Sequence, residues 1–185
     1  MIPDIIKDAE QKMSGAVEHA REEFAAIRTG RAHPAMFNKL MVDYYGSPTP
    51  LQQLATFQVP EARTVLISPF DRASMAGIEK AIRDSDLGVN PANDGNVIRV
   101  VMPQLSEERR RDYVKLARSK AEEARVAVRN IRRHANDAVH KLAKDKEVGE
   151  DDARNAEKQL DGVTKKHVDT IDELVKSKEA ELLEV

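Results

Sequence analysis

Apolar residues recur at spacings of three and four along three long segments of the chain, a pattern that predicts amphipathic helices. The segments are residues 4–27, 106–146 and 152–183. Each apolar stripe needs a partner to cover it, and only a short turn near Gly149 separates the last two segments. The pattern therefore predicts an elongated three-helix bundle, with Asp151 or Asp152 capping the last helix.

A different pattern fills the middle of the chain. Seven of the eight prolines lie there, from Pro34 to Pro103, and proline interrupts helix interiors. Runs rich in β-branched and aromatic residues predict strands, and one amphipathic run predicts a helix. The strand candidates are residues 40–45, 64–67, 97–101 and, more weakly, 51–59, and the helix candidate is residues 74–85. The expected fold class is α+β: a three-helix bundle with a small inserted β/α/β domain.

The insert divides the chain into two domains. We expect residues 1–29 and 105–185 to form the bundle and residues 32–103 to form the inserted domain. Two segments, near residues 29–31 and 103–105, connect them, and two compact bodies joined in this way favour a hinge. The predicted hinge residues are Thr29, Gly30, Pro103, Gln104 and Leu105.

Charge is distributed unevenly along a chain whose formal net charge is only −2. Residues 106–133 hold ten Lys or Arg against five Asp or Glu, whereas residues 147–185 hold six against twelve. Five arginines of the basic segment fall within an arc of about 60° over about 30 Å of helix axis. They are Arg111, Arg118, Arg125, Arg129 and Arg132. A row of one sign indicates a polyanion as partner, with nucleic acid the first candidate.

The arginine row also has a structural interpretation. It lies about a quarter of a turn from the apolar stripe, so we expect its side chains to stay in solvent. Arginines on a solvated helix often pair with nearby glutamates, and Glu122 can serve Arg118 and Arg125 in this way. From Arg125 to Arg133, however, no acidic residue intervenes. The acidic last helix could instead neutralise the arginines inside the bundle, so both interpretations remain open.

The residue types favour folded, double-helical RNA as the polyanion. Single-stranded nucleic acid is bound by stacking on exposed aromatic side chains, and the basic helix has only Tyr113. No recognised DNA-reading module occurs in the sequence. A straight helix with a row of arginines suits the phosphates of an RNA that is read by its shape.

Several kinds of chemistry are missing from the sequence. There is no cysteine, none of the five histidines forms a metal-binding pair, and His167 is best explained as a core residue of the last helix. No phosphate-binding loop or nucleophile turn occurs, and no stretch approaches the ~20 apolar residues of a membrane span. We therefore expect a cytoplasmic protein that is not an enzyme and uses no cofactor, metal or membrane.

Six motifs resemble the bacterial ribosome recycling factor (ribosome-releasing factor) family. They are Ile27-Arg-Thr-Gly-Arg-Ala32 followed by Pro34, Asp43-Tyr-Tyr-Gly46 followed by Thr49-Pro50, Asp86-Leu-Gly-Val-Asn-Pro91, Ile98-Arg-Val100 with Pro103, Glu107-Glu-Arg-Arg110, and Val128-Arg-Asn-Ile-Arg-Arg133. The resemblance runs essentially from end to end, without large insertions.

The resemblance implies an L-shaped protein whose bundle is joined to the smaller domain by a flexible hinge. Such factors bind the post-termination ribosome and, with elongation factor G and GTP, split it into subunits, releasing it from mRNA for a new round of initiation. The resemblance also implies a monomer, and an inserted domain that elongation factor G pushes. By matching motifs, the contacts to large-subunit ribosomal RNA would be Arg28, Arg31, Arg110, Arg129, Arg132 and Arg133.

On the residues alone, two other classes remain as alternatives. A structural or chaperone-like bundle would use its arginines only in salt bridges between the basic and acidic helices, and would bind no RNA. An uncharacterised nucleic-acid enzyme would need a catalytic set of residues that the sequence does not supply.

Overall fold

A computed structural model describes residues 1–184 of the chain. The chain divides into two compact units. The first, here called the bundle unit, is formed by Met1–Arg28 together with the chain from Glu107 onward. The second, here called the insert unit, is Thr29–Ser106, and it contains all the strands found in the described residues.

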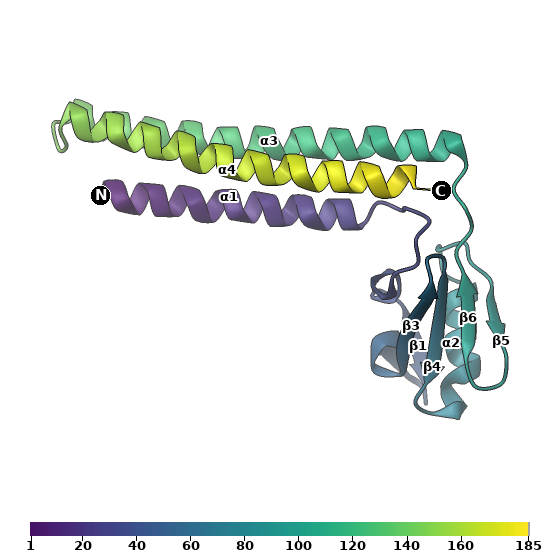
Figure 1. Ribbon diagram of the computed structural model, residues 1–185. Helices are drawn as coiled ribbons and strands as arrows, with labels where there is room; N and C mark the ends of the chain where they lie inside the picture. The colour runs from purple at the N-terminus through teal and green to yellow at the C-terminus, as the bar shows by residue number, and fades with distance from the viewer. Residues whose placement is uncertain (185) are drawn as a thin grey trace. The chain divides into compact units, whose positions relative to one another are not determined.

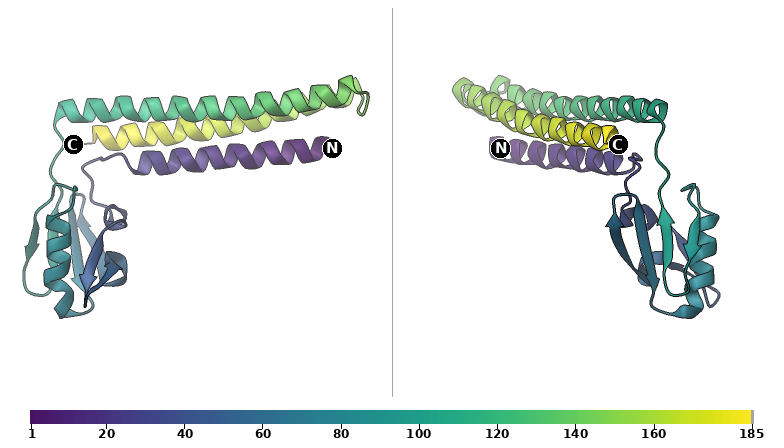
Figure 2. Two further views of the ribbon diagram at one scale, coloured as in Figure 1. Left: turned by 180° about the vertical axis from the view of Figure 1, so that it is seen from behind. Right: turned by 45° about the vertical axis from the view of Figure 1, so that its right-hand side comes forward.

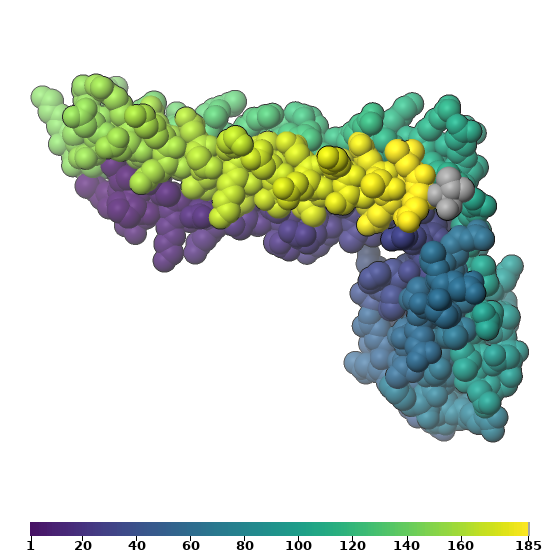
Figure 3. Space-filling model, in the orientation of Figure 1, coloured from purple at the N-terminus to yellow at the C-terminus, as the bar shows by residue number. Residues whose placement is uncertain are grey.

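Three long helices build the bundle unit (Figures 1 and 2). They are α1 (Ile2–Ala25), α3 (Glu107–Lys144) and α4 (Glu150–Leu183). Each of them packs along both of the others, and Figure 3 shows α4 lying along α1 on the visible face of this unit. The three helices expected from the apolar stripes are therefore confirmed, with small differences at their ends.

The cap expected for the last helix is wrong. α4 begins at Glu150 with Gly149 as its N-cap, and Asp151 and Asp152 lie inside its first turn. The glycine offers no side chain to the free amides at the helix start. Negative charge in a first turn is nevertheless favourable because it faces the positive end of the helix dipole. The two aspartates therefore support the start of the helix without defining it.

A tight turn closes α3 and returns the chain into α4. The amide of Glu147 donates to the carbonyl of Leu142 at 2.9 Å, and the amide of Lys146 donates to that of Ala143 at 3.1 Å. Lys146 has φ 59°, the left-handed conformation of a Schellman closure. This closure sets α3 and α4 antiparallel and so determines which of their side chains face each other.

A buried polar pair lies within the apolar interior of the bundle. The ring of His167 is almost fully buried, with Nδ1 2.7 Å from the carbonyl oxygen of Val163 and Nε2 3.2 Å from Oγ of Ser14. Because a carbonyl can only accept, Nδ1 carries the proton and Nε2 accepts from the Ser14 hydroxyl. Both ring nitrogens are satisfied, and the expectation of a core histidine is confirmed.

Lys178 occupies a position on the buried face of α4 where the periodicity would place an apolar residue. It is only 9% exposed, and its Nζ lies 3.7 Å from a carboxylate oxygen of Glu181. Burial lowers the pKa of Lys178, and the attraction of Glu181 only partly opposes that effect. At neutral pH the folded protein therefore holds a poorly solvated charge.

We expect Lys178→Met to raise the free energy of unfolding at neutral pH by about 1 kcal/mol, because an apolar chain of similar volume removes a buried charge. The folded-state pKa lies below the unfolded value, so the wild-type protein gains stability as pH rises from that lowered pKa to about 10.4. The advantage of the variant should shrink over that window. Urea unfolding at neutral and alkaline pH measures both effects.

The matched control for this variant is Lys176→Met, on the exposed side of the same helix. It removes the same charge without burial and should change stability by no more than about 0.5 kcal/mol. A loss of stability in Lys178→Met would show that the contact with Glu181 outweighs the cost of burying the ammonium group.

The insert unit contains two antiparallel sheets and one helix. A hairpin pairs β1 (Met41–Tyr44) with β2 (Ser47–Pro50). The second sheet has the strand order β3-β4-β6-β5. Its strands are β3 (Ala55–Glu61), β4 (Thr64–Pro69), β5 (Pro91–Asn93) and β6 (Ile98–Val101). Helix α2 (Met75–Arg83) packs against β1 and β5, and it confirms the predicted helix.

Two of these strands escape the sequence patterns because they contain proline. β2 holds Pro48 and Pro50 and β5 holds Pro91, and both segments have the composition of turns. Both are edge strands, paired on one side only, where the missing amide of proline is tolerated. The weak strand candidate at residues 51–59 is also corrected: Leu51–Gln53 forms a 3₁₀ turn before the strand begins.

The hairpin turn is formed by Tyr45 and Gly46, with φ of 51° and 81°. Two positive values in a two-residue loop define a type I′ turn, which glycine adopts freely and tyrosine does not. The hydroxyls of Tyr44 and Tyr45 lie 2.9 and 3.5 Å from Oδ2 of Asp71, and the two rings meet edge to face. These contacts offset the cost of the positive φ of Tyr45. Because Tyr45 belongs to the turn, β1 ends one residue earlier than the strand predicted over residues 40–45.

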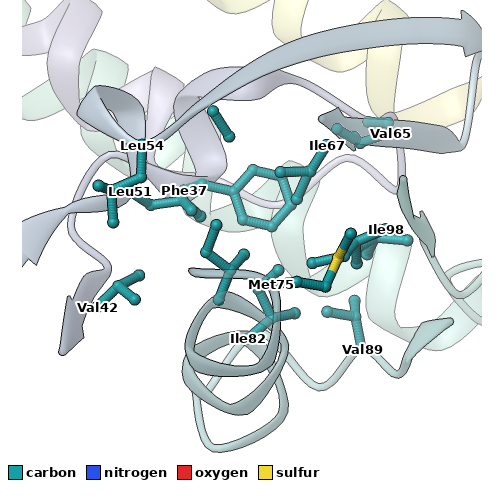
Figure 4. Packing of buried hydrophobic residues seen from close by; sticks show 14 of the residues in the cluster. Phe37, Val42, Leu51, Leu54, Val65, Ile67, Met75, Ile82, Val89 and Ile98 are labelled. Atoms are coloured by element: carbon teal, nitrogen blue, oxygen red, sulfur yellow. The ribbon is translucent and has the colours of Figure 1, made fainter. Parts of the chain in front are cut away.

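Phe37 lies at the centre of the insert unit's core (Figure 4). Its side chain is fully buried, and its ring stacks 5.8 Å from that of Phe57. Other fully or almost fully buried side chains of this core are Val42, Leu51, Val65, Ile67, Ile78, Ile82, Ile98 and Val100. All members of this cluster lie between Ala32 and Met102. The insert unit therefore has a hydrophobic core of its own.

Candidate nucleic-acid interface

The basic side chains near the start of α3 are mostly at the surface. Arg111 pairs with Glu107, one turn earlier on the same helix, at 2.6 Å. This contact is a solvated helix pair of the kind that contributes a few tenths of a kcal/mol. Arg110 is half-buried and has no hydrogen-bond or ion-pair partner among residues 1–184. Of these two arginines, Arg110 is the one whose charge is uncommitted.

Arg118 and Arg125 are bound to α4. Nε of Arg118 donates to Glu179 at 2.5 Å, and Nε of Arg125 donates to Asp172 at 2.7 Å. Arg125 also donates to Glu122 at 3.1 Å, and only 22% of its side chain is exposed. For these two arginines the structure favours the second of the two interpretations left open by the sequence, in which the acidic last helix neutralises them.

Arg129, Arg132 and Arg133 form a second group, here called the 129–133 cluster. Their spacings of three and four place them on one helical face, with Cβ atoms about 5–6 Å apart. Arg129 and Arg132 each lie 3.7 Å from a carboxylate oxygen, of Glu122 and Asp161 respectively, which is too far for a hydrogen bond. Arg133 is exposed and has no hydrogen-bond or ion-pair partner in the part of the chain that the structure describes. The cluster thus presents three guanidinium groups that no carboxylate binds directly.

Arg132 is the most constrained member of the cluster. Its Nε is buried, and within residues 1–184 that N–H has no hydrogen-bond partner. A buried donor without an acceptor costs about 1–3 kcal/mol. The free energy of the guanidinium therefore falls if it turns toward a group that accepts hydrogen bonds from two of its N–H donors, as a pair of phosphate oxygens does.

The acidic partners on α4 are the residues that the sequence patterns do not single out. They are Asp161, Asp172 and Glu179. A signal exists, because Arg118, Arg125 and Arg132 are seven residues apart and a seven-residue spacing returns to one face in a helical bundle. The spacing alone does not say which acidic residue stands opposite each arginine. That pairing depends on the closure between α3 and α4.

The other two arginines predicted to contact RNA lie where the units join in sequence. Arg28 is the last residue of the bundle unit's first segment, and Arg31 belongs to the insert unit. The amide of Arg31 donates to Oγ1 of Thr29 at 3.3 Å, and the next amide, of Ala32, donates to the carbonyl of Ala62 at 2.7 Å. The backbone around Arg31 is thereby anchored to the insert unit.

The predicted hinge residues all lie in the two terminal segments of the insert unit. Gly30 has φ +78°, a conformation that L side chains rarely adopt. A methyl group on Gly30 would lie 3.7 Å from Cγ of Leu105 and 3.9 Å from the carbonyl oxygen of Pro103. The outgoing and returning segments therefore run close together at this point.

The described residues contain neither a candidate metal site nor a candidate membrane-spanning helix. No group of three or more His, Asp or Glu residues that could hold a metal ion occurs in residues 1–184. Over the same residues, no helix is both long enough and apolar enough to cross a bilayer. Fold and site together define a helical-bundle protein with an inserted β domain, which carries a cluster of three arginines that are not hydrogen-bonded to any carboxylate in residues 1–184.

Comparison with known proteins identifies the family. The sequence model of the family described as Ribosome recycling factor matches residues 20–183. The ribosome-recycling factor of Cutibacterium acnes is 71% identical over 98% of this chain and 99% of its own length. That of Kineococcus radiotolerans is 66% identical over the full length of both. The chain belongs to the ribosome recycling factor family, whose members are non-enzymatic translation factors.

Solved structures agree with this assignment. A solution structure of the ribosome recycling factor matches with a TM-score of 0.80 and 43% identity, over 100% of this chain and 98% of that one. A second match has a TM-score of 0.69 and 41% identity over 100% of both chains. It is described as models for the T. thermophilus ribosome recycling factor and the E. coli elongation factor G bound to the E. coli post-termination complex. The predicted fold class and the resemblance seen in the motifs are thereby confirmed.

Proposed function

We propose that this chain recycles ribosomes after translation termination. It binds the post-termination ribosome in the cytoplasm and, with elongation factor G and GTP, separates the ribosome into subunits and releases it from mRNA. Membership of the family supports this function, as does the likeness to a factor described together with elongation factor G on the post-termination complex. GTP hydrolysis belongs to the partner, and this chain contributes binding and geometry.

The 129–133 cluster is the observation that carries the proposal. Its three guanidinium groups are directed to one face of α3 and are not hydrogen-bonded to carboxylates. Guanidinium groups bind phosphate oxygens through charge-assisted, often bidentate hydrogen bonds. The proposed contacts to large-subunit ribosomal RNA are Arg28, Arg31, Arg110, Arg129, Arg132 and Arg133. Since such contacts go to the backbone, the RNA is recognised by shape.

The two units have different roles in this proposal. The bundle unit is held on the RNA by phosphate contacts, and the insert unit moves against it when elongation factor G pushes. The segments 29–31 and 103–105 form the hinge between the two units of a monomer. Their close approach at Gly30 and the separate core of the insert unit support this division of labour. Movement of one body relative to a fixed one is what subunit separation requires.

Light scattering of vacant bacterial 70S ribosomes tests the function directly. Mixing the ribosomes with this protein, elongation factor G and GTP should lower the scattering, because subunits scatter less than whole ribosomes. Omitting any one of the three should abolish the drop. If no drop occurs with an elongation factor G that is active in translocation, the recycling function is withdrawn.

A further inference from the structure

Arg118, Arg125 and Arg132 are spaced seven residues apart, and they differ in the hydrogen bond that their Nε–H group makes. In Arg118 and Arg125 the Nε–H group donates to a carboxylate of α4. Arg132 is the next member, and it faces Asp161 through Nη1 at 3.7 Å, without a hydrogen bond. Its Nε–H remains unpaired within residues 1–184. Asp161 therefore attracts this guanidinium but does not fix it.

We propose that Asp161 competes with the RNA phosphate for Arg132. The carboxylate holds the guanidinium near α4 while the protein is free, and Arg132 leaves it when a phosphate is bound. Asp161 thereby limits the affinity for RNA and favours release. This role rests on the proposed function, because Asp161 acts beside the same RNA-binding cluster.

The competition follows from the chemistry of the two anions. A carboxylate and a phosphate accept from the same donors of the guanidinium fork, so the attraction of Asp161 for Nη1 of Arg132 opposes a bidentate bond from that arginine to a phosphate. Asp161 is 64% exposed and lies at the edge of the site. Its carboxylate lies 3.7 Å from Nη1 of Arg132, well within the ~8 Å over which charges interact at physiological salt. The nearby Lys165 does not cancel that charge, because its Nζ is already bound to Asp169 at 2.8 Å.

Glu179 provides a matched comparison on the same helix. Its carboxylate accepts a hydrogen bond from Arg118 at 2.5 Å. Arg118 is eleven residues from Arg129, about 16 Å along the axis of α3, which is roughly twice the screening distance. Glu179 should therefore act on the stability of the bundle and leave RNA affinity unchanged.

The test measures dissociation constants for purified large ribosomal subunits at about 0.1 M salt, where phosphate contacts dominate affinity. Asp161→Asn keeps the shape and removes the charge, and it should bind about two- to fivefold more tightly than wild type. Glu179→Gln removes an equal charge and should bind like wild type. In a background of Arg132→Gln, the substitution Asp161→Asn should have no effect, because the side chain for which it competes is gone.

Two results would overturn the competition. One is an affinity of Asp161→Asn equal to or weaker than wild type. The other is a gain that persists in the Arg132→Gln background, or that Glu179→Gln reproduces, since it would reflect net charge alone. These failures differ from failure of the proposed function, in which the wild-type protein would not bind the subunits or Arg132→Gln would bind as well as wild type.

Discussion

Replacing Arg129, Arg132 and Arg133 together by glutamine is expected to weaken binding to the large ribosomal subunit about a hundredfold at about 0.1 M salt. Each lost phosphate contact removes a salt-dependent slope of roughly 0.7–0.9, so three contacts remove a slope of about 2–2.7 and most of the attraction at that salt. Filter binding over a salt series measures the affinity and the slope. The helical content should not change, because none of the three side chains is buried in the core.

A triple variant of α4 matches this change in charge. Lys158, Lys165 and Lys166 are exposed on the acidic helix, and replacing them by glutamine lowers the net charge by the same three units. Their contribution to RNA binding should be small. If the two triple variants lose affinity equally, the 129–133 cluster is not the contact and the attraction is only to the overall charge.

The second large effect is expected for Phe37→Ala in the core of the insert unit. Removing a fully buried phenylalanine costs about 3–5 kcal/mol, which is comparable to the total stability of about 5 kcal/mol found for marginal domains. Hydrogen exchange measured by mass spectrometry should show lost protection over residues 29–106. The bundle helices should remain protected, because no member of this core cluster belongs to them.

The control for this experiment is Phe70→Ala, which removes the same side chain from a site that is 69% exposed. It should leave the exchange of the insert unit close to that of wild type, since little buried area is lost. Equal loss of protection in both units of Phe37→Ala would mean that the chain unfolds as a single cooperative body. Such a result would contradict the independent core.

The helices were predictable because their stripes repeat over many turns. Along α4 the predicted apolar stripe consists of Ala153, Ala156, Leu160, Val163, His167, Ile171 and Leu174. Five of these side chains are buried, and Val163 and Leu174 are half-buried. The same periodicity does not reveal Lys178, because composition alone assigns a lysine to the surface. In the insert, the short edge strands β2 and β5 are hidden, since the local propensity of their proline-containing segments opposes a pairing that only neighbouring strands provide.

The candidate site was predictable only in part. The stretch from 125 to 133 contains four arginines and no acidic residue, which indicates an anion-binding face. The resemblance to the family selects Arg129, Arg132 and Arg133 within it. The carboxylates that neutralise Arg118 and Arg125 come from another helix, and their positions depend on the register that the closure at Lys146 sets. A contact between side chains 61 residues apart, such as Arg118 with Glu179, is a property of tertiary structure.

The hydrogen bond between Ser14 and His167 joins residues 153 positions apart. At typical synthesis rates of 5–20 residues per second, about 8–30 seconds separate their appearance on the translating ribosome. The insert unit, whose core lies between Ala32 and Met102, can be completed in that interval. α1, the first helix made, packs against both α3 and α4 in the folded protein, so part of its apolar face stays uncovered until the last helix exists. The insert unit is therefore expected to fold before the bundle unit is complete.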